Sequence, residues 1–137
     1  MTGVQTCALP ICSLYRLEEV LDETGADQSL VKELEDYGVI KGEKHDGEML
    51  YDDTEREIVR ATAELKRFGV GGRNLRVFRT SADREAALLE QLVGAALRSR
   101  SQARRKEAIE NLESLAAVCG HLKHLLLVRD LRRLKGD

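Results

Sequence analysis

Hydrophobic residues from position 13 onward recur mostly at the three- and four-residue spacing of amphipathic helices. In the first predicted helix, Leu14, Leu17, Val20 and Leu21 share one face, and Gly25 ends the helix. A second predicted helix follows after a very short turn.

Asp27 stands where the N-cap of the second helix is expected, and Gly38 stands where that helix ends. The apolar positions of this helix are Leu30, Val31, Leu34 and Tyr37. Two short apolar segments then flank a polar stretch: Val39-Ile40 comes before it and Met49-Leu50-Tyr51 after it. This pattern predicts a two-stranded hairpin whose loop is the polar stretch Lys41 to Glu48.

Asp52 and Glu55 have the spacing of a capping box at the start of a third helix, which Gly69 ends. Its predicted apolar face consists of Ile58, Ala61, Leu65 and Phe68. Three more helices are predicted: a short one with Leu75 and Phe78, one capped by Thr80 or Ser81 and ending near Arg98, and one from about Ala103 to Leu134.

Helix, turn, helix, short hairpin and helix, in that order, predict a mainly α fold. We expect a winged helix-turn-helix with a small two-stranded wing over residues 13–80. A helical hairpin or coiled-coil region, acting in dimerisation or effector binding, is expected over residues 81–137.

Residues 1–12 are set aside because they resemble a translated sequencing adapter; a signal peptide is the alternative, but the segment has no basic start. On this interpretation the native protein begins upstream, and Cys119 is the only native thiol.

Composition narrows the class of protein further. Of the 137 residues 42% are hydrophobic, and no apolar run approaches the length of a membrane-spanning helix. The three cysteines do not form a disulfide pattern.

Residues 13–60 carry 6 basic and 15 acidic side chains (formal charge -9), whereas residues 61–137 carry 16 basic and 9 acidic side chains (formal charge +7). The near-neutral total of -2 therefore hides an acidic front and a basic back.

The last predicted helix contains a heptad pattern that starts at Ala108 and continues with alternating spacings of four and three residues. Its members, the candidate dimerisation residues, are Leu112, Leu115, Cys119, Leu122 and Leu126. Neighbouring apolar residues broaden this face, which suits both the preceding helix and a second subunit. The expected partner is a second copy of the chain; an intramolecular helical hairpin is the alternative.

From Tyr15 onward the ordered elements resemble the MerR-type transcription regulators. The matching features are Tyr15, Leu17, Val20, Thr24-Gly25, Asp27, Glu35-Asp36-Tyr37-Gly38, Val39-Ile40, Gly47, Tyr51, Asp53 and Phe68-Gly69. The segments LEDYGVI, LKRFGV and LRVFRTSADREAALLEQLV are also similar to the C-terminal half of a longer actinobacterial regulator of cell-division genes. The resemblance implies a cytoplasmic, dimeric DNA-binding regulator, of which this chain is a fragment.

In that family the second helix enters the major groove, and the wing reaches the flanking DNA backbone or the minor groove. The resemblance therefore gives Ser29, Lys32, Lys41, Lys44 and His45 as candidate DNA-binding residues. The departures from the family pattern include Lys32 and Met49, which replace arginines, and Glu33 and Glu48, which replace aromatic residues. These changes weaken attraction to phosphate. The alternative is an interaction or dimerisation module whose winged helix does not itself read DNA.

A second basic cluster surrounds the last helix junction: Arg98, Arg100, Arg104, Arg105 and Lys106. It fits either phosphate or an acidic partner; alternatively, its cations complement a helix end and pair with nearby glutamates.

His121 and His124 could share a metal ion, but Cys119 points elsewhere on the helix, so we expect no metal site. No phosphate-binding glycine motif or catalytic set of residues is recognisable, and we expect no cofactor, no enzyme activity and no membrane contact.

Overall fold

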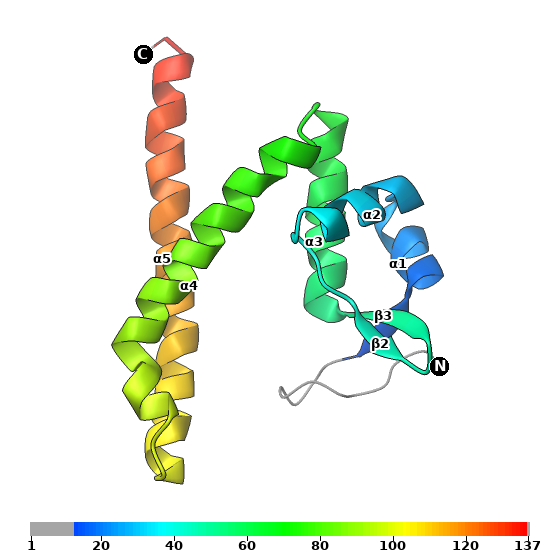
Figure 1. The fold of residues 1–137 in the computed structure, drawn as a ribbon. Coiled ribbons are helices and arrows are strands. Elements are labelled where there is room, and N and C mark those ends of the chain that lie inside the picture. Colours follow the sequence, from blue (N-terminus) through cyan, green and yellow to red (C-terminus); the bar gives the residue numbers. More distant parts are fainter. Residues whose placement is uncertain (1–12, 137) are drawn as a thin grey trace. The chain divides into compact units, whose positions relative to one another are not determined.

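The computed structural model describes residues 13–136 and divides the chain into two compact units, between Thr80 and Ser81 (Figure 1). Residues 1–12, which the sequence sets aside as non-native, lie outside the described residues. The elements are β1 (Leu14–Arg16), α1 (Leu17–Thr24), α2 (Gln28–Asp36), β2 (Glu43–His45), β3 (Glu48–Asp52), α3 (Asp53–Arg67), a 3-10 turn η1 (Gly72–Asn74), α4 (Leu75–Leu97) and α5 (Gln102–Leu134). The predicted mainly helical fold with a small antiparallel wing is confirmed.

The core of the first unit is built where three helices meet. Val20 from α1, Leu34 from α2 and Val59 from α3 are each 0% exposed. Further buried side chains complete this core: Ala26, Leu30, Val31, Ile40, Tyr51 and Leu75. Burying each large aliphatic side chain contributes about 1.5–3 kcal/mol to folding, so this cluster fixes the orientation of α2.

The sheet has three strands rather than the two predicted. Its order is β1-β3-β2, all antiparallel, with Tyr15 opposite Tyr51. Leu14 was assigned to the first helix, and that was wrong: it lies in β1 with its side chain buried. Helix α1 begins only at Leu17, where the Glu19 carboxylate accepts the backbone N–H of Arg16 at 2.9 Å. A strand of three residues is too short to show an alternating pattern, so the helical spacing of Leu14 and Leu17 misled the prediction.

The outer strand of the wing was also misplaced. Val39 and Ile40 are not a strand; both backbone N–H groups donate to the carbonyl of Leu34 and close the end of α2. Strand β2 instead comes from the polar stretch, with Lys44 opposite Met49. Asp46 and Gly47 join β2 to β3 with φ angles of 51° and 82°, as a two-residue turn of the hairpin type requires. A charged edge strand has no apolar pattern that would reveal it.

Helix α3 begins where the sequence predicted. The Asp52 carboxylate accepts the N–H of Glu55 at 2.8 Å. The predicted apolar face was shifted, however, because Val59 and Thr62 are buried whereas Phe68 is 83% exposed. Both faces of α3 carry apolar residues, so periodicity alone could not choose between them.

Helix α4 runs without interruption through the position of the predicted second cap. The Ser81 hydroxyl donates to the Glu85 carboxylate at 2.9 Å, within the helix, instead of capping a new one. No glycine or proline stands between Leu75 and Ser81 to end a helix there. The separate short helix was therefore a wrong expectation.

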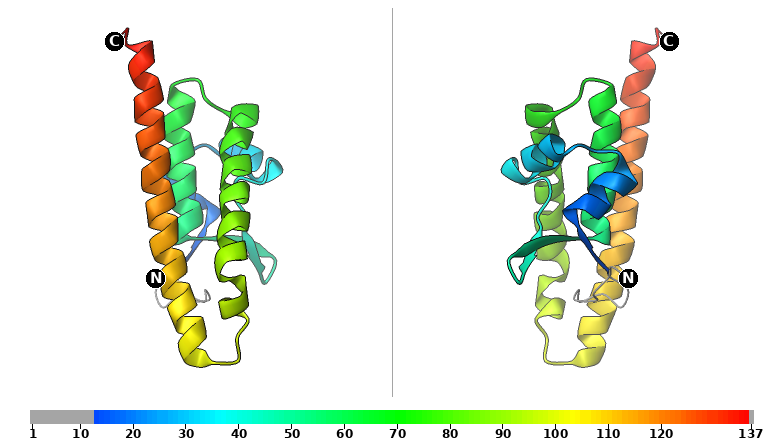
Figure 2. Two further views of the ribbon diagram at one scale, coloured as in Figure 1. Left: turned by 90° about the vertical axis from the view of Figure 1, so that its left-hand side faces the viewer. Right: turned by 90° about the vertical axis from the view of Figure 1, so that its right-hand side faces the viewer.

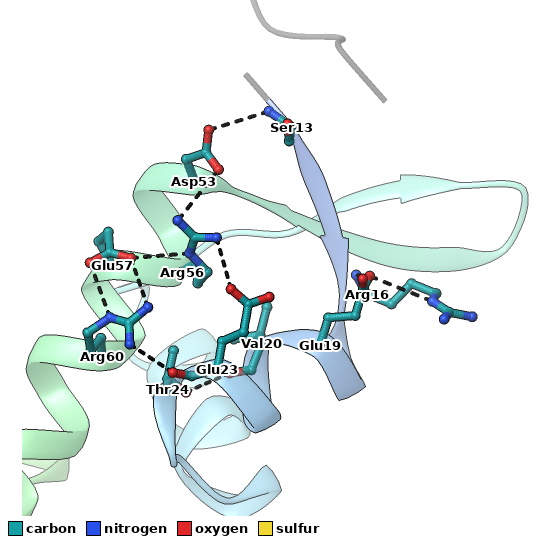
Figure 3. Close-up of polar contacts among 10 residues, drawn as sticks. All are labelled: Ser13, Arg16, Glu19, Val20, Glu23, Thr24, Asp53, Arg56, Glu57 and Arg60. Atoms are coloured by element: carbon teal, nitrogen blue, oxygen red, sulfur yellow. Dashed lines mark hydrogen bonds and ion pairs between the residues drawn. The ribbon is translucent and has the colours of Figure 1, made fainter. Parts of the chain in front are cut away.

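A polar network joins α3 to the end of α1 and to β1 (Figure 3). The Arg56 guanidinium lies 3.1 Å from carboxylate oxygens of both Glu23 and Glu57, and 4.6 Å from the centroid of the Tyr15 ring. Arg60 donates to the backbone carbonyl of Glu23 at 2.7 Å, close to the C-terminus of α1. Two cations thus tie the third helix to the first.

We expect Arg56→Met to lower the free energy of unfolding by about 1 kcal/mol, because it removes partly buried ion pairs and the contact with Tyr15. Arg67→Met, an exposed change at the end of the same helix, is the matched control and should have little effect. Urea unfolding monitored by circular dichroism measures both. Equal losses for the two variants would contradict a stabilising role of this network.

Candidate nucleic-acid interface and assembly helices

The outward face of α2 is formed by Ser29, Lys32 and Asp36, which are exposed opposite the buried Leu30 and Leu34. Both predicted α2 contacts, Ser29 and Lys32, therefore point to solvent. The Ser29 hydroxyl donates to the Asp27 carboxylate at 2.8 Å. Asp36 places a carboxylate beside Lys32 on the same face, so this face carries one positive and one negative charge.

The two carboxylates that flank this face are engaged within the unit. Glu35 accepts the phenolic O–H of Tyr51 at 3.0 Å. Burial, and then the hydrogen bond to Glu35, raise the pKa of Tyr51 above its usual value. Glu33 accepts the backbone N–H of Gly72 at 3.2 Å, in the turn that precedes α4.

The sequence interpretation of Glu33 as a carboxylate facing phosphate therefore needs correction. Its acceptor atoms turn toward Gly72, which has a φ of +45°. The Arg76 guanidinium covers the ring of Tyr37, 5.3 Å from its centroid, on the same flank of α2. No pattern in the sequence could have paired position 33 with a glycine 39 residues later.

The wing brings the other three predicted residues to the surface. Lys41 and Lys44 are exposed, and the His45 ring nitrogen lies 3.2 Å from a carboxylate oxygen of Glu43. The backbone N–H of Lys41 donates to Glu55. Exposed acidic residues surround these cations on the wing: Glu43, Asp46 and Glu48.

Met49, which stands where MerR-type regulators have an arginine, packs against the backbone of the wing. A Cβ atom built on Gly42 would lie 2.6 Å from its side chain and 3.0 Å from the Tyr51 ring. The wing therefore has a compact apolar contact where the MerR-type pattern has a cation. On α2 and the wing together, carboxylates lie close to the lysines and reduce their attraction to phosphate.

In the second unit, α4 and α5 run antiparallel and are joined by a short turn (Figures 1 and 2). Leu89 and Val93 of α4 and Ala108 of α5 are buried. Lys123 donates to the Ser81 hydroxyl at 3.0 Å and pairs with Glu85. The hydrogen bond from Lys123 lowers the pKa of Glu85.

The predicted heptad residues divide into two groups. Leu112, Leu115 and Cys119 are half-buried, whereas Leu122 and Leu126 are 56% and 39% exposed. Further along α5, two rows of aliphatic side chains are exposed at the spacing i, i+4, i+7. The first row is Val118, Leu122 and Leu125, and the second row is Leu127, Leu131 and Leu134. At 100° per residue these rows lie on opposite sides of the helix.

Within residues 13–136, no three His, Cys, Asp or Glu side chains are arranged to hold a metal ion. Cys119 is half-buried, and His121 and His124 are exposed. No described helix is long and apolar enough to cross a membrane.

Gly72→Ala is expected to lower the free energy of unfolding by about 1–2 kcal/mol, because an alanine there combines a left-handed backbone with a Cβ atom 3.0 Å from the Glu33 carboxylate. Gly71→Ala is the matched control: its φ is -158°, and the nearest atom to an added Cβ lies 3.9 Å away. Chemical denaturation of both variants gives the comparison. A Gly72→Ala protein as stable as the control would rule out a tight turn at this position.

A search of curated proteins gave no match. The family model described as "Rv1828-like, C-terminal domain" matches residues 13–135. The match includes the winged helix and both helices of the second unit, and leaves out residues 1–12. This chain belongs to the Rv1828-like C-terminal domain family.

Proposed function

We propose that this chain is the assembly part of a MerR-type, DNA-binding transcriptional regulator, and that α5 joins two copies of it. The family description supports a C-terminal position within a regulator. The resemblance of three segments to actinobacterial regulators supports cell-division genes as targets and the cytoplasm as the place of action. Catalysis, a cofactor and a resident metal have no part in this proposal.

The observation that carries the proposal is the exposed apolar surface of α5. The row formed by Val118, Leu122 and Leu125 is 51–65% exposed, and the row on the opposite side, formed by Leu127, Leu131 and Leu134, is 46–81% exposed. A helix that is apolar on two sides is stable in water only when partners cover it. A second copy supplies such a partner with the same apolar composition.

In this proposal the winged helix is a folded module that does not choose the operator. Its α2 face has a single lysine beside Asp36, and three carboxylates surround the wing cations. Sequence readout needs side chains that reach base edges, and it depends on phosphate contacts to hold the helix in register. The acidic surroundings oppose those contacts.

The double variant Leu122→Lys/Leu125→Lys should convert a dimer into a monomer of about 15.3 kDa, because it places two ammonium groups in the first row. Val77→Lys, a change at a 70% exposed position on α4, should remain dimeric. Size-exclusion chromatography with light scattering measures the masses, and circular dichroism confirms that all proteins are folded. A wild-type chain that stays monomeric at high micromolar concentration would contradict the proposal.

A second candidate function is direct DNA binding by α2. It is favoured by one observation: Ser29 and Lys32 are exposed on the outward face, where a helix entering the major groove needs polar side chains. If it holds, Lys32→Glu should abolish saturable binding to an operator duplex in fluorescence anisotropy. Arg67→Glu, which changes the net charge by the same amount at an exposed position of α3, controls for net charge. Unchanged binding by the Lys32 variant would remove this candidate.

A further inference from the structure

The turn between α4 and α5 forms a concentrated basic surface, which we call the basic tip. Residues 98–106 contain five cations and no carboxylate. These cations are Arg98, Arg100, Arg104, Arg105 and Lys106. All except the half-buried Arg105 are exposed.

These cations have no carboxylate partner in the part of the chain that the structure describes. Ion pairs on α4 and α5 form between other residues, among them Lys123 with Glu85, and Arg129 and Arg133 with Asp130. Arg105 donates instead to the backbone carbonyl of Ser99. The expected pairing of this cluster with nearby glutamates therefore does not occur.

The helix macrodipole does not account for the tip either. Arg98 and Arg100 follow the C-terminus of α4, where positive charge is favourable. Arg104, Arg105 and Lys106 lie in the first turns of α5, whose N-terminus already carries partial positive charge. Three cations at that end repel the helix dipole and each other, and the first carboxylate of α5, Glu107, comes only after them. Their charge is therefore available to an anion from outside the chain.

The composition of the tip distinguishes nucleic acid from an acidic protein as the source of that anion. Its remaining residues are Ser99, Ser101, Gln102 and Ala103, so it offers no large apolar side chain. Protein–protein interfaces normally have an apolar centre, whereas surfaces that contact DNA are polar and strongly basic. Arginine, four of the five cations, also matches the geometry of phosphate.

We infer that the basic tip binds the phosphate backbone of duplex DNA, independently of base sequence and separately from α2 and the wing. This inference rests on the proposed role in a DNA-binding regulator. The net charge of -2 does not prevent DNA binding at the tip. Exposed charges are screened beyond about 10 Å at 0.1 M salt, so the charges near the tip determine its attraction to phosphate. Such a contact strengthens the hold of the regulator on DNA without adding specificity.

The experiment is a fluorescence-anisotropy titration of a mixed-sequence duplex with the 137-residue chain, between about 50 and 200 mM salt. The test variant is Arg100→Glu/Arg104→Glu. The control, Arg84→Glu/Arg133→Glu, changes charge by the same amount at exposed positions of α4 and α5 outside the tip. Thermal unfolding verifies that each variant is folded, and light scattering records its mass.

We expect the test variant to bind about tenfold more weakly at the lowest salt and to show a salt slope smaller by about 2, while the control stays near wild type. Absence of wild-type binding at about 50 mM salt, or equal weakening by both variants, would overturn the inference. Displacement of the duplex by polyglutamate as effectively as by unlabelled DNA of equal charge would also overturn it and assign the tip to an acidic protein. The mass measurement tests the assembly proposal separately, so the two can fail independently.

Discussion

The first unit depends on the packing of one aliphatic side chain from each of its three helices. Val20, Leu34 and Val59 are completely buried against one another's helices, and this contact fixes which side of α2 points outward. The Arg56 and Arg60 network then holds α3 against the end of α1. This packing makes the winged helix a rigid module, whether or not its surface contacts DNA.

The core of that module is that of a winged helix, but its surface is rich in acidic residues. Glu33 and Glu35 accept hydrogen bonds from groups inside the unit, and Glu33 does so at a position where the MerR-type pattern has an aromatic residue. Exposed acidic side chains on the wing add to these carboxylates. The unpaired cations and exposed aliphatic rows lie in the second unit instead, on the turn before α5 and along α5 itself. These features of the second unit are the basis on which we propose a module used for assembly and non-specific DNA contact.

Long amphipathic patterns and caps were enough to predict most of the fold from the sequence. Asp27 and Asp52 cap α2 and α3 as expected, since capping depends on local spacing. Strand β1 and the contact between Glu33 and Gly72 could not be predicted, because each is created by a partner distant in sequence. The candidate residues of α2 and the wing are exposed as expected, but their acidic surroundings become clear only once the wing is folded.

The most direct test of this account is a ¹⁵N heteronuclear NMR titration of the folded chain with a mixed-sequence duplex. The account predicts that amide shifts change at residues 98–106 and that Ser29, Lys32 and Asp36 keep their positions. Changes concentrated on those three α2 residues, with residues 98–106 unaffected, would contradict it and show that α2 docks on DNA.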